Sequence, residues 1–572
     1  MADQGLAVPP RLLEEGQAMS TTTGGTEYDA VVIGGGHHGT VISCYLARAG
    51  LKVGVFEAHT ALGGGAGSEE GPAPGFRQDF CAHLIRFYTH PANKDFDLAS
   101  HGLEYLFPEQ YAGSAQEVGA IFDDDTSYIG YAAHRAVDPK NPSPTEYAPD
   151  NVKKTYDQIA RFSAHDADAY LRYVEAYRTH WRPALSRYKY SPPPPWGTQD
   201  ALEELLGVEG SLLEPVHMFM SLSQLAKDFF ESDEMRTIFM REAATSAGCY
   251  ADDTIGLEGL LHFLVSTLSL EPTALAKGGT QAITDALVSA GRQLGVEYHT
   301  GTEVTRVLVE SGKAAGVELA DGTRVKARIV VSDLGVPQTY LRLLEGAGIS
   351  DRIKRRIRNI SYDRGQILWG NIAVHEFPEY TAEKHNPGIG RQPRLYTGAA
   401  DAEYMTTKYP HDIFLLGFPQ ELHVMATADS IWDPSRVPEG KHTFLVEEFC
   451  APARMFSPSE WTRLKEDFTQ QWLEKWQSLA PNMTKDNVIS TRLYSPYDVE
   501  QTHPDMIDGG WTEGSMIASQ LGRFRPFPEL AKYRTHVPNL YICSSNLHSG
   551  GGLGQGSSLN AFNVIAQDHG LS

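Results

Sequence analysis

The sequence is poor in cysteine, with five cysteines among 572 residues. An odd number of widely spaced cysteines fits neither a disulfide framework nor a clustered zinc site, so we expect no metal centre and a reducing, cytoplasmic location. No two of them form a CxxC pair, which excludes the dithiol relay of a disulfide reductase. The five are Cys44, Cys81, Cys249, Cys450 and Cys543.

Basic residues are scarce relative to acidic ones. Lys and Arg number 49 against 72 Asp and Glu, which gives a formal net charge of -23. Such a surface repels nucleic acid and anionic headgroups, so we expect no nucleic-acid partner. Peripheral contact with a membrane stays open, because a local apolar patch can bind a bilayer whatever the net charge.

Long apolar runs are missing too. No uninterrupted stretch reaches the roughly 20 residues that a membrane-spanning helix needs. Residues 1–26 contain no apolar core and carry Asp3, Glu14 and Glu15, unlike a secretory signal or a basic transit peptide, so we expect a flexible extension. With 41% hydrophobic and 21% charged residues, the rest is typical of a globular enzyme.

The first strongly patterned unit follows directly. Residues 28–33 predict a buried strand, residues 40–49 a helix closed by Gly50, and residues 52–56 a second, parallel strand. This is a βαβ unit.

A glycine-rich turn joins the first strand to the helix of this unit. Gly34, Gly36 and Gly39 satisfy GxGxxG at the point where backbone NH groups of a helix N-terminus can approach a pyrophosphate. Glu57 ends the second strand about 20 residues later, where an acidic side chain accepts the hydrogen bonds of an adenosine ribose. The pattern predicts a dinucleotide site but does not separate FAD from NAD.

A second glycine run, residues 62–68, comes just after Glu57. It resembles the motif by which flavoproteins of the amine oxidase and phytoene desaturase superfamily let their backbone approach FAD. The resemblance implies that Gly63, Gly64 and Ser68 contact FAD, whereas a surface glycine loop is the alternative.

The far end of the chain makes the resemblance specific. Residues 533–543, the run His548 to Gly552, and Asn560-Ala561 are similar to the C-terminal signature of phytoene dehydrogenase-like and carotenoid desaturase-like NAD(P)/FAD-dependent oxidoreductases. The chain also resembles the branch labelled pyridine nucleotide-disulfide oxidoreductase domain-containing protein 2, although the missing cysteine pair contradicts the disulfide part of that label. Residues 229–232 and 278–333 also fit, so the similarity extends from Tyr28 to the end.

The family resemblance also implies further cofactor contacts. Val304 occupies the position whose backbone contacts the adenine, and Ser545, Gly554 and Gln555 belong to the glycine region before a helix that faces the isoalloxazine. A helix N-terminus stabilises the negative charge of a reduced flavin. Ser544, Asn546 and Ser549 depart from the family, which usually has glycine, glycine and proline there.

The remaining patterns predict an α/β fold with discontinuous domains. Long helical patterns cover residues 157–188 and 212–247, and a cluster of short strands follows a helix that ends near Gly295. We predict a Rossmann-like FAD-binding domain from residues 27–155, 268–340 and 510–572, and a mixed α/β substrate domain with a helical insert from residues 156–267 and 341–509.

The reaction expected from these patterns is hydride abstraction from a carbon of a largely apolar or aromatic small molecule, by desaturation or alcohol-type dehydrogenation or as an oxidase. A flavin-dependent isomerase and a non-catalytic flavin-binding partner protein are the alternatives. Oxygen, a quinone and a nicotinamide all stay open as electron acceptor.

His548 is the predicted catalytic residue, since it follows a strand at the edge where open α/β sheets bind ligands. Capping of the loop through backbone hydrogen bonds is the equal alternative. His37 and His38 are interpreted as variable loop positions, and His83 and Arg86 as structural residues, with lining of the flavin site as the less favoured interpretation. For the aromatic stretches 170–190 and 219–239, core packing is the favoured interpretation, and the floor of a substrate tunnel is the less favoured one.

Overall fold

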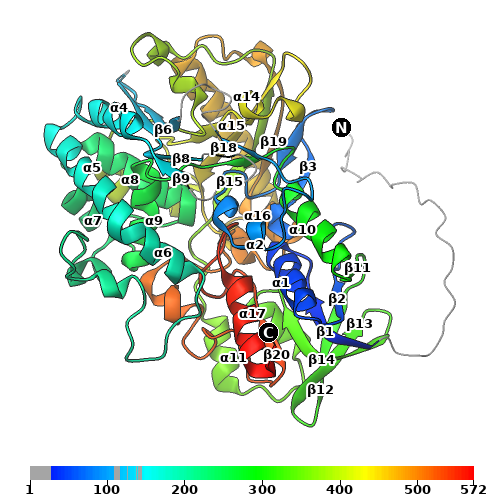
Figure 1. Cartoon of the computed structure of the whole chain (residues 1–572). Helices are drawn as coiled ribbons and strands as arrows, with labels where there is room; N and C mark the ends of the chain where they lie inside the picture. The colour runs from blue at the N-terminus through cyan, green and yellow to red at the C-terminus, as the bar shows by residue number, and fades with distance from the viewer. Residues whose placement is uncertain (1–26, 108–115, 125, 137, 139–144, 572) are drawn as a thin grey trace, which may run out of the picture.

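The computed structural model describes residues 27–107, 116–124, 126–136, 138 and 145–571, so the predicted extension 1–26 lies outside the described part. Two seven-stranded sheets with helices around them form the molecule (Figure 1). Among the described residues, no helix has both the length and the apolar character that crossing a bilayer requires.

The first sheet brings together three distant parts of the chain. Its order is β11-β2-β1-β14-β13-β12, and β20 also pairs with β14. Strands β11, β2, β1, β14 and β20 run parallel, whereas β12, β13 and β14 form an antiparallel meander. The strands are β1 (Glu27–Ile33), β2 (Val53–Phe56), β11 (Glu297–His299), β12 (Val304–Glu310), β13 (Lys313–Leu319), β14 (Arg324–Ser332) and β20 (Leu540–Ile542).

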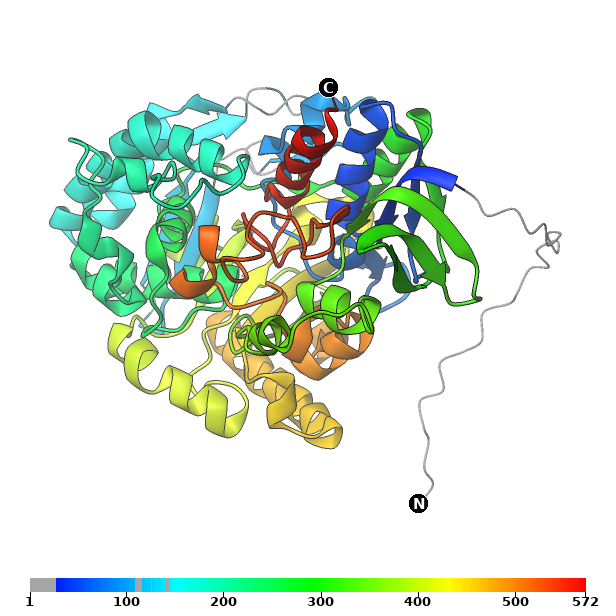
Figure 2. The same cartoon turned by 90° about the horizontal axis from the view of Figure 1, so that it is seen from below.

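The parallel part of this sheet is buried on both faces, which explains its continuous apolar sequence. Ala30, Val31 and Val32 of β1 and Val330 and Val331 of β14 are completely buried. Helices α1 (His37–Arg48), α10 (Gln281–Gln293) and α17 (Ser557–His569) pack together beside the sheet (Figure 2). Ser43 and Leu46 are fully buried, as expected for the inner face of α1.

The second sheet has the order β19-β15-β18-β17-β16-β6-β7, and all its neighbours are antiparallel except β16 and β6. Every residue of β15, which lies between β19 and β18, is buried. The strands are β6 (Gln116–Ile121), β7 (Ser127–Tyr131), β15 (Ile367–Val374), β16 (Arg394–Thr397), β17 (Met425–Thr427), β18 (His442–Phe449) and β19 (Val488–Tyr494).

A group of helices lies on the side of the second sheet away from α1 and β2 (Figure 1). Two consecutive members, α8 and α9, pack on one another. The group contains α4 (Pro149–Ile159), α5 (Ala164–Ala176), α6 (Arg182–Lys189), α7 (Leu222–Phe229), α8 (Asp233–Ala247) and α9 (Gly256–Thr267).

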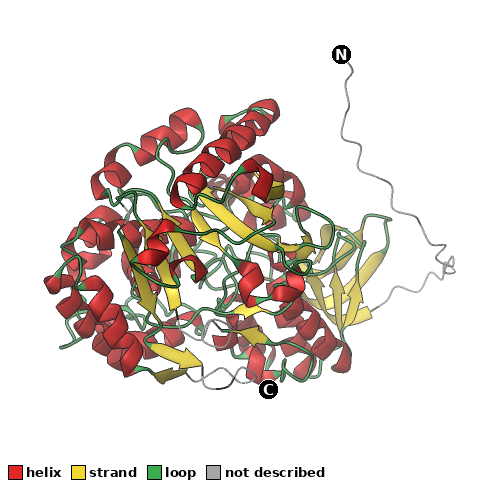
Figure 3. Ribbon diagram, turned by 90° about the horizontal axis from the view of Figure 1, so that it is seen from above, coloured by secondary structure: helices red, strands yellow, loops and turns green. Residues whose placement is uncertain are grey.

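The remaining helices and two-stranded sheets are distributed around the two large sheets (Figure 3). The longest helix, α15, starts with a capping box in which Ser457 and Glu460 satisfy one another's backbone NH groups. The helices are α2 (Ala92–Asp95), α11 (Asp351–Arg358), α12 (Ala402–Thr407), α13 (Tyr409–Leu416), α14 (Asp429–Trp432), α15 (Pro458–Leu479) and α16 (Pro496–Thr502). Three two-stranded sheets pair β3 (Ser68–Glu70) with β4 (Arg77–Asp79), β5 (Tyr105–Leu106) with β10 (Leu275–Ala276), and β8 (His134–Ala136) with β9 (Thr145–Tyr147).

The predicted α/β class is confirmed, and the predicted first unit is present, with one boundary of each strand and the end of the helix shifted by one residue and the start of the helix by three. The helix starts at His37 rather than Thr40, because Gly36 with its extended ψ of -179° serves as its N-cap. The predicted domain boundaries stay a prediction. Strands β6 and β7 belong to the second sheet, although both fall inside residues 27–155, the first predicted segment of the FAD-binding domain.

Candidate functional site

The first glycine turn is held in a conformation that side chains do not fit. Gly34 has a φ of +95°, in the left-handed region that favours glycine. A Cβ on Gly39 would lie 2.3 Å from the backbone oxygen of Gly34, and one on Gly36 would lie 2.7 Å from Oδ2 of Asp333. Because Gly34 and Gly36 carry no side chain and line a cavity, the backbone of this turn is open to a ligand at the N-terminus of α1.

The second glycine run packs directly on the first. The Gly63 NH donates to the Gly35 carbonyl at 2.9 Å, and Gly36 and Gly63 form an isolated parallel bridge. Gly63 and Gly64 have φ values of +129° and +54°. The two runs predicted to touch one cofactor thus form one continuous backbone surface.

Glu57 is fixed by the same surface. Its Oε2 accepts a hydrogen bond from the Gly35 NH at 2.7 Å, and its Oε1 accepts one from the His59 NH at 2.8 Å. Each carboxylate oxygen keeps a further lone pair. Because Glu57 lines the adjoining cavity, those lone pairs are available to ribose hydroxyls.

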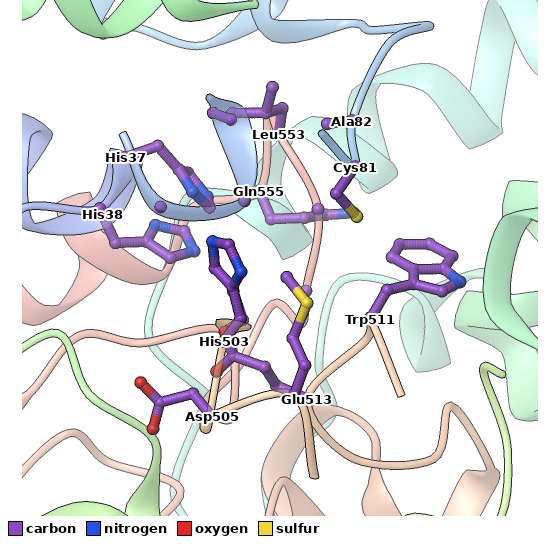
Figure 4. Close-up of a pocket in the computed structure, with 18 of the residues that line it drawn as sticks. His37, His38, Cys81, Ala82, His503, Asp505, Trp511, Glu513, Leu553 and Gln555 are labelled. Atoms are coloured by element: carbon purple, nitrogen blue, oxygen red, sulfur yellow. The ribbon is translucent and has the colours of Figure 1, made fainter. Parts of the chain in front are cut away.

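A cavity of about 520 Å³ starts at this surface and continues between the two sheets. Its size is in the ordinary range of ligand sites. Figure 4 shows His37 and His38 on one side of it, opposite His503, Asp505 and Glu513, with Gln555 and Cys81 nearby.

Seven of the predicted cofactor residues line this cavity: Gly34, Gly36, Glu57, Gly64, Val304, Ser545 and Gln555. The Oε1 of Gln555 is buried and has no hydrogen-bond partner, so a cofactor atom can use it. Gly39, Gly63 and Gly554 stand just behind the lining. A Cβ on Gly554 would come within 3.2 Å of the Arg86 backbone.

Ser68 stays a predicted cofactor contact, and its hydroxyl is bonded within the protein. Its Oγ donates to Oδ1 of Asp79 at 2.6 Å and accepts from the Gln281 NH at 3.1 Å. Asp79 in turn forms an ion pair of 2.5 Å with the buried Arg436. Ser68 is absent from the cavity lining, and these bonds join the cofactor segments to the region of α14.

His548 is buried behind the loop that it was expected to project from. Its Nε2 lies 2.8 Å from the Tyr188 carbonyl oxygen, and it is absent from the cavity lining. Burial lowers the pKa of His548 to about 4, so the ring is neutral at pH 7. This geometry favours the loop-capping alternative over proton exchange.

His37 and His38 face the cavity side by side, with ring centroids 4.0 Å apart (Figure 4). Burial lowers the pKa of His37 to about 4 and that of His38 further below its usual value. The Nε2 atoms of both rings lack hydrogen-bond partners. They are lining residues of the site and not only variable loop positions.

Three acidic residues near the glycine turn were missed as site residues: Asp333, Asp505 and Glu513. Burial raises the pKa of Asp333 well above its ordinary value, and the nearby Asp505 and Glu57 add to the effect. Burial therefore disfavours the charged form of Asp333 beside the glycine turn. The sequence shows that Asp333 directly follows a predicted strand. An aspartate at that position does not by itself indicate that it lines a cofactor site.

The far end of the cavity is built from the helical group and the second sheet. Glu258, His262 and Phe263 come from α9, Lys189 ends α6, and the sheet adds Ile367, Arg394, Met425 and Glu447. Burial raises the pKa of Glu258 to about 7 and that of Glu447 to about 8, the range in which a carboxylate accepts protons at neutral pH. The i, i+4 spacing of Glu258 and His262 was the one available sequence signal.

His83 and Arg86 also line the cavity, which agrees with the less favoured interpretation of these two residues. By contrast, no aromatic residue of stretches 170–190 and 219–239 is among the lining residues. Tyr170, Trp181 and Phe239 are completely buried in the core around the second sheet. The core interpretation of these stretches is therefore correct.

The five cysteines are all free. Cys81 lines the cavity, and burial raises its pKa, which favours the thiol over the reactive thiolate.

Comparison with known proteins supports a flavin-dependent oxidoreductase. Residues 32–97 match the model of the NAD(P)-binding Rossmann-like domain. The chain is 26% identical to pyridine nucleotide-disulfide oxidoreductase domain-containing protein 2 of Rattus norvegicus, over 95% of this chain and 94% of that protein. It is 24% identical to a limonene dehydrogenase polypeptide of Castellaniella defragrans, over 95% of both chains.

Two further comparisons agree. The zeta-carotene-forming phytoene desaturase of Myxococcus xanthus is 23% identical over 94% of this chain and 92% of its own length. A solved structure of a putrescine oxidase variant has a TM-score of 0.57 at 14% identity, covering 95% of this chain and 99% of that one. These comparisons confirm the predicted resemblance, the fold class and an oxidoreductase.

Proposed function

We propose that the chain is an FAD-dependent dehydrogenase or desaturase that removes hydride from a carbon of a mainly apolar small molecule. One observation carries this proposal: a single cavity joins the glycine turns and Glu57 to the apolar and polar groups of the second sheet and α9. A dinucleotide and a second molecule can thus meet within it.

The cavity lining includes residues suited to each part of FAD. Val304 and Glu57 would hold the adenosine end, and Gly34, Gly36 and Gly64 would hold the diphosphate. Gly551, Gly552 and Gln555 lie in the loop before α17, whose N-terminus favours negative charge on the flavin ring. Bound FAD supplies the two-electron acceptor, and oxygen, a quinone and a nicotinamide are the candidates for the acceptor that follows it.

The chain's own residues would position the substrate and keep water away. Phe263, Ile367, Met425 and Trp511 give the far end apolar walls. An apolar wall orients a hydrocarbon part and excludes solvent from the reacting carbon. The names of two relatives specify limonene and phytoene, which supports a substrate with a large apolar part.

We also propose a domain division and a cellular location. The first is the division into an FAD-binding domain and a substrate domain, with the cavity at their junction. The second is a cytoplasmic location, which the free cysteines favour.

Anaerobic titration of the purified protein with candidate substrates tests the proposal. Bleaching of the flavin absorbance by a desaturable or oxidisable apolar compound supports it. Turnover only after prior reduction would instead indicate the isomerase, and a flavin that no candidate reduces would favour a binding protein.

A further inference from the structure

Three cationic side chains converge at the far end of the cavity: Arg86, Lys189 and Arg394. They come from the segment after β4, from the end of α6 and from β16. His262 of α9 lies within electrostatic range of all three, since each of them lowers its pKa. The cluster is therefore assembled around one face of α9.

These cations are incompletely paired. The Nη1 of Arg394 makes no hydrogen bond, and its nearest carboxylate, that of Glu242, is 3.7 Å away. Arg86 uses Nη1 on the Ser266 hydroxyl at 3.1 Å, but its Nε has no partner. Lys189 forms no ion pair with any residue that the structure describes, and burial lowers its pKa to about 8.

Carboxyl groups around the cluster neutralise it only in part. Despite its burial, Glu242 has a lowered pKa because the charge of Arg394 lies 3.7 Å away, and Glu271 is paired with Arg182 at 2.6 Å. Burial raises the pKa of Glu117, Glu258 and Glu447 to about 7, 7 and 8, so these three are partly protonated at neutral pH. Arg86 and Lys189 therefore lack a fully ionised partner inside the cavity, where a missing counter-charge is costly.

We propose that the substrate carries a carboxylate, which binds between Lys189, Arg86 and Arg394 while its apolar part lies against Phe263 and Met425. This rests on the proposed function and names the substrate class of the same site: an apolar carboxylic acid. Guanidinium and ammonium groups bind carboxylates through charge-assisted hydrogen bonds. A cationic amine would instead meet three like charges.

A carboxylate fits better than a phosphate. Glu258 and Glu447 line the same end of the cavity as the cations. In their ionised fraction at neutral pH, these two groups repel the nearly double negative charge of a phosphate more strongly than the single negative charge of a carboxylate.

The test is calorimetric titration of the purified holoprotein with benzoate and with its neutral analogue benzamide, at pH 7. Both probes are small enough to enter a cavity of this size whatever the natural substrate is. We expect benzoate to bind at least about tenfold more tightly than benzamide, and Lys189→Met to remove most of that difference.

Arg187→Met is the matched control. Arg187 lies on the same helix as Lys189, but its side chain is 60% exposed and pairs with Glu204. Its benzoate affinity should equal that of the wild type. Arg394→Met should lower the benzoate affinity as Lys189→Met does. If the loss of Arg394 prevents folding, Lys189→Met alone still decides the test.

Equal affinity for benzoate and benzamide, or a preference for benzoate that survives Lys189→Met, would overturn the proposal. Tighter binding of phenyl phosphate than of benzoate would overturn the choice of carboxylate. FAD content and flavin reduction are measured separately on the same samples. Absence of FAD or of flavin reduction, with benzoate binding intact, would refute the proposed function but not the proposed anion site.

Discussion

Glu57 and Gly35 are joined by a hydrogen bond of 2.7 Å, which ties the carboxylate predicted to hold the ribose to the turn predicted to hold the diphosphate. One side chain therefore serves two ends of the nucleotide site. It can contact the ribose, and it also fixes the backbone that faces the phosphates.

Glu57→Ala should consequently weaken FAD binding in two ways. Loss of a charged acceptor from the Gly35 NH and from the ribose costs about 1 to 3 kcal/mol, or roughly a tenfold to hundredfold rise in Kd. Fluorescence titration of the apoprotein with FAD measures this. Glu310→Ala, on an exposed position of β12, is the control and should bind FAD normally. An unchanged Kd for Glu57→Ala would place the ribose elsewhere.

Gly36→Ala should reduce FAD occupancy at least about tenfold, because the new Cβ would stand 2.7 Å from Asp333 Oδ2 and would cover the amide surface. The amount of FAD per chain after purification gives the answer. Gly312→Ala lies in a hairpin turn with no atom within 4 Å of the added Cβ, and its occupancy should stay normal despite local strain at its φ of +79°. Full occupancy in Gly36→Ala would contradict the assignment.

His548→Gln should leave the rate of flavin reduction within a few-fold of the wild type. The ring is neutral and bonded to the Tyr188 carbonyl, and glutamine can donate the same hydrogen bond. Stopped-flow absorbance of the flavin is the measurement. A hundredfold slower reduction at normal FAD content would restore His548 as an acid-base catalyst.

Cys81→Ser should retain both FAD and turnover. Cys81 lines the cavity, but no other cysteine is bonded to it and its raised pKa favours the inert thiol. Steady-state turnover under a chosen acceptor measures this. Loss of activity that depends on added thiol would revive a disulfide chemistry.

Benzoate affinity should fall as the pH rises from 6 to 9. Lys189 loses its positive charge as the pH passes its pKa of about 8, while Glu258 and Glu447 gain negative charge through about 7 and 8. All three changes disfavour an anion. His262, with a pKa lowered by burial to about 3, stays neutral throughout.

The benzoate affinity should fall roughly tenfold or more over this pH range, since a charge-assisted hydrogen bond is worth about 1.5 to 3 kcal/mol. Benzoate itself stays ionised over this range. Calorimetry at four pH values provides the curve. In Lys189→Met the dependence should become shallower, and an affinity that rises with pH would contradict the arrangement of charges.

The nucleotide end of the site was predictable because its chemistry is local. Gly34, Gly36 and Glu57 lie within one βαβ unit, where strand, turn and helix follow one another in the sequence. The same holds for the β12 to β14 meander, whose alternation and Asp321-Gly322 turn are visible in one short stretch. Local patterns thus account for most of the first sheet.

The substrate end was not predictable, because it is made by contacts between distant segments. Lys189, His262 and Arg394 come from α6, α9 and β16, and no local pattern indicates that they share a cavity. His548 shows the opposite difficulty. Its position after a strand suggested the ligand edge, but the loop folds back so that its ring meets Tyr188 instead.

Strand β14 pairs with β1 near the start of the described chain, and with β20 close to its end. The flavin site therefore cannot be completed by a nascent chain until β20 and α17 have left the ribosome. Until then the edge of β14 that pairs with β20 lacks its partner. A sheet assembled from such distant segments is expected to fold slowly, with a longer exposure of its apolar strand edges to aggregation.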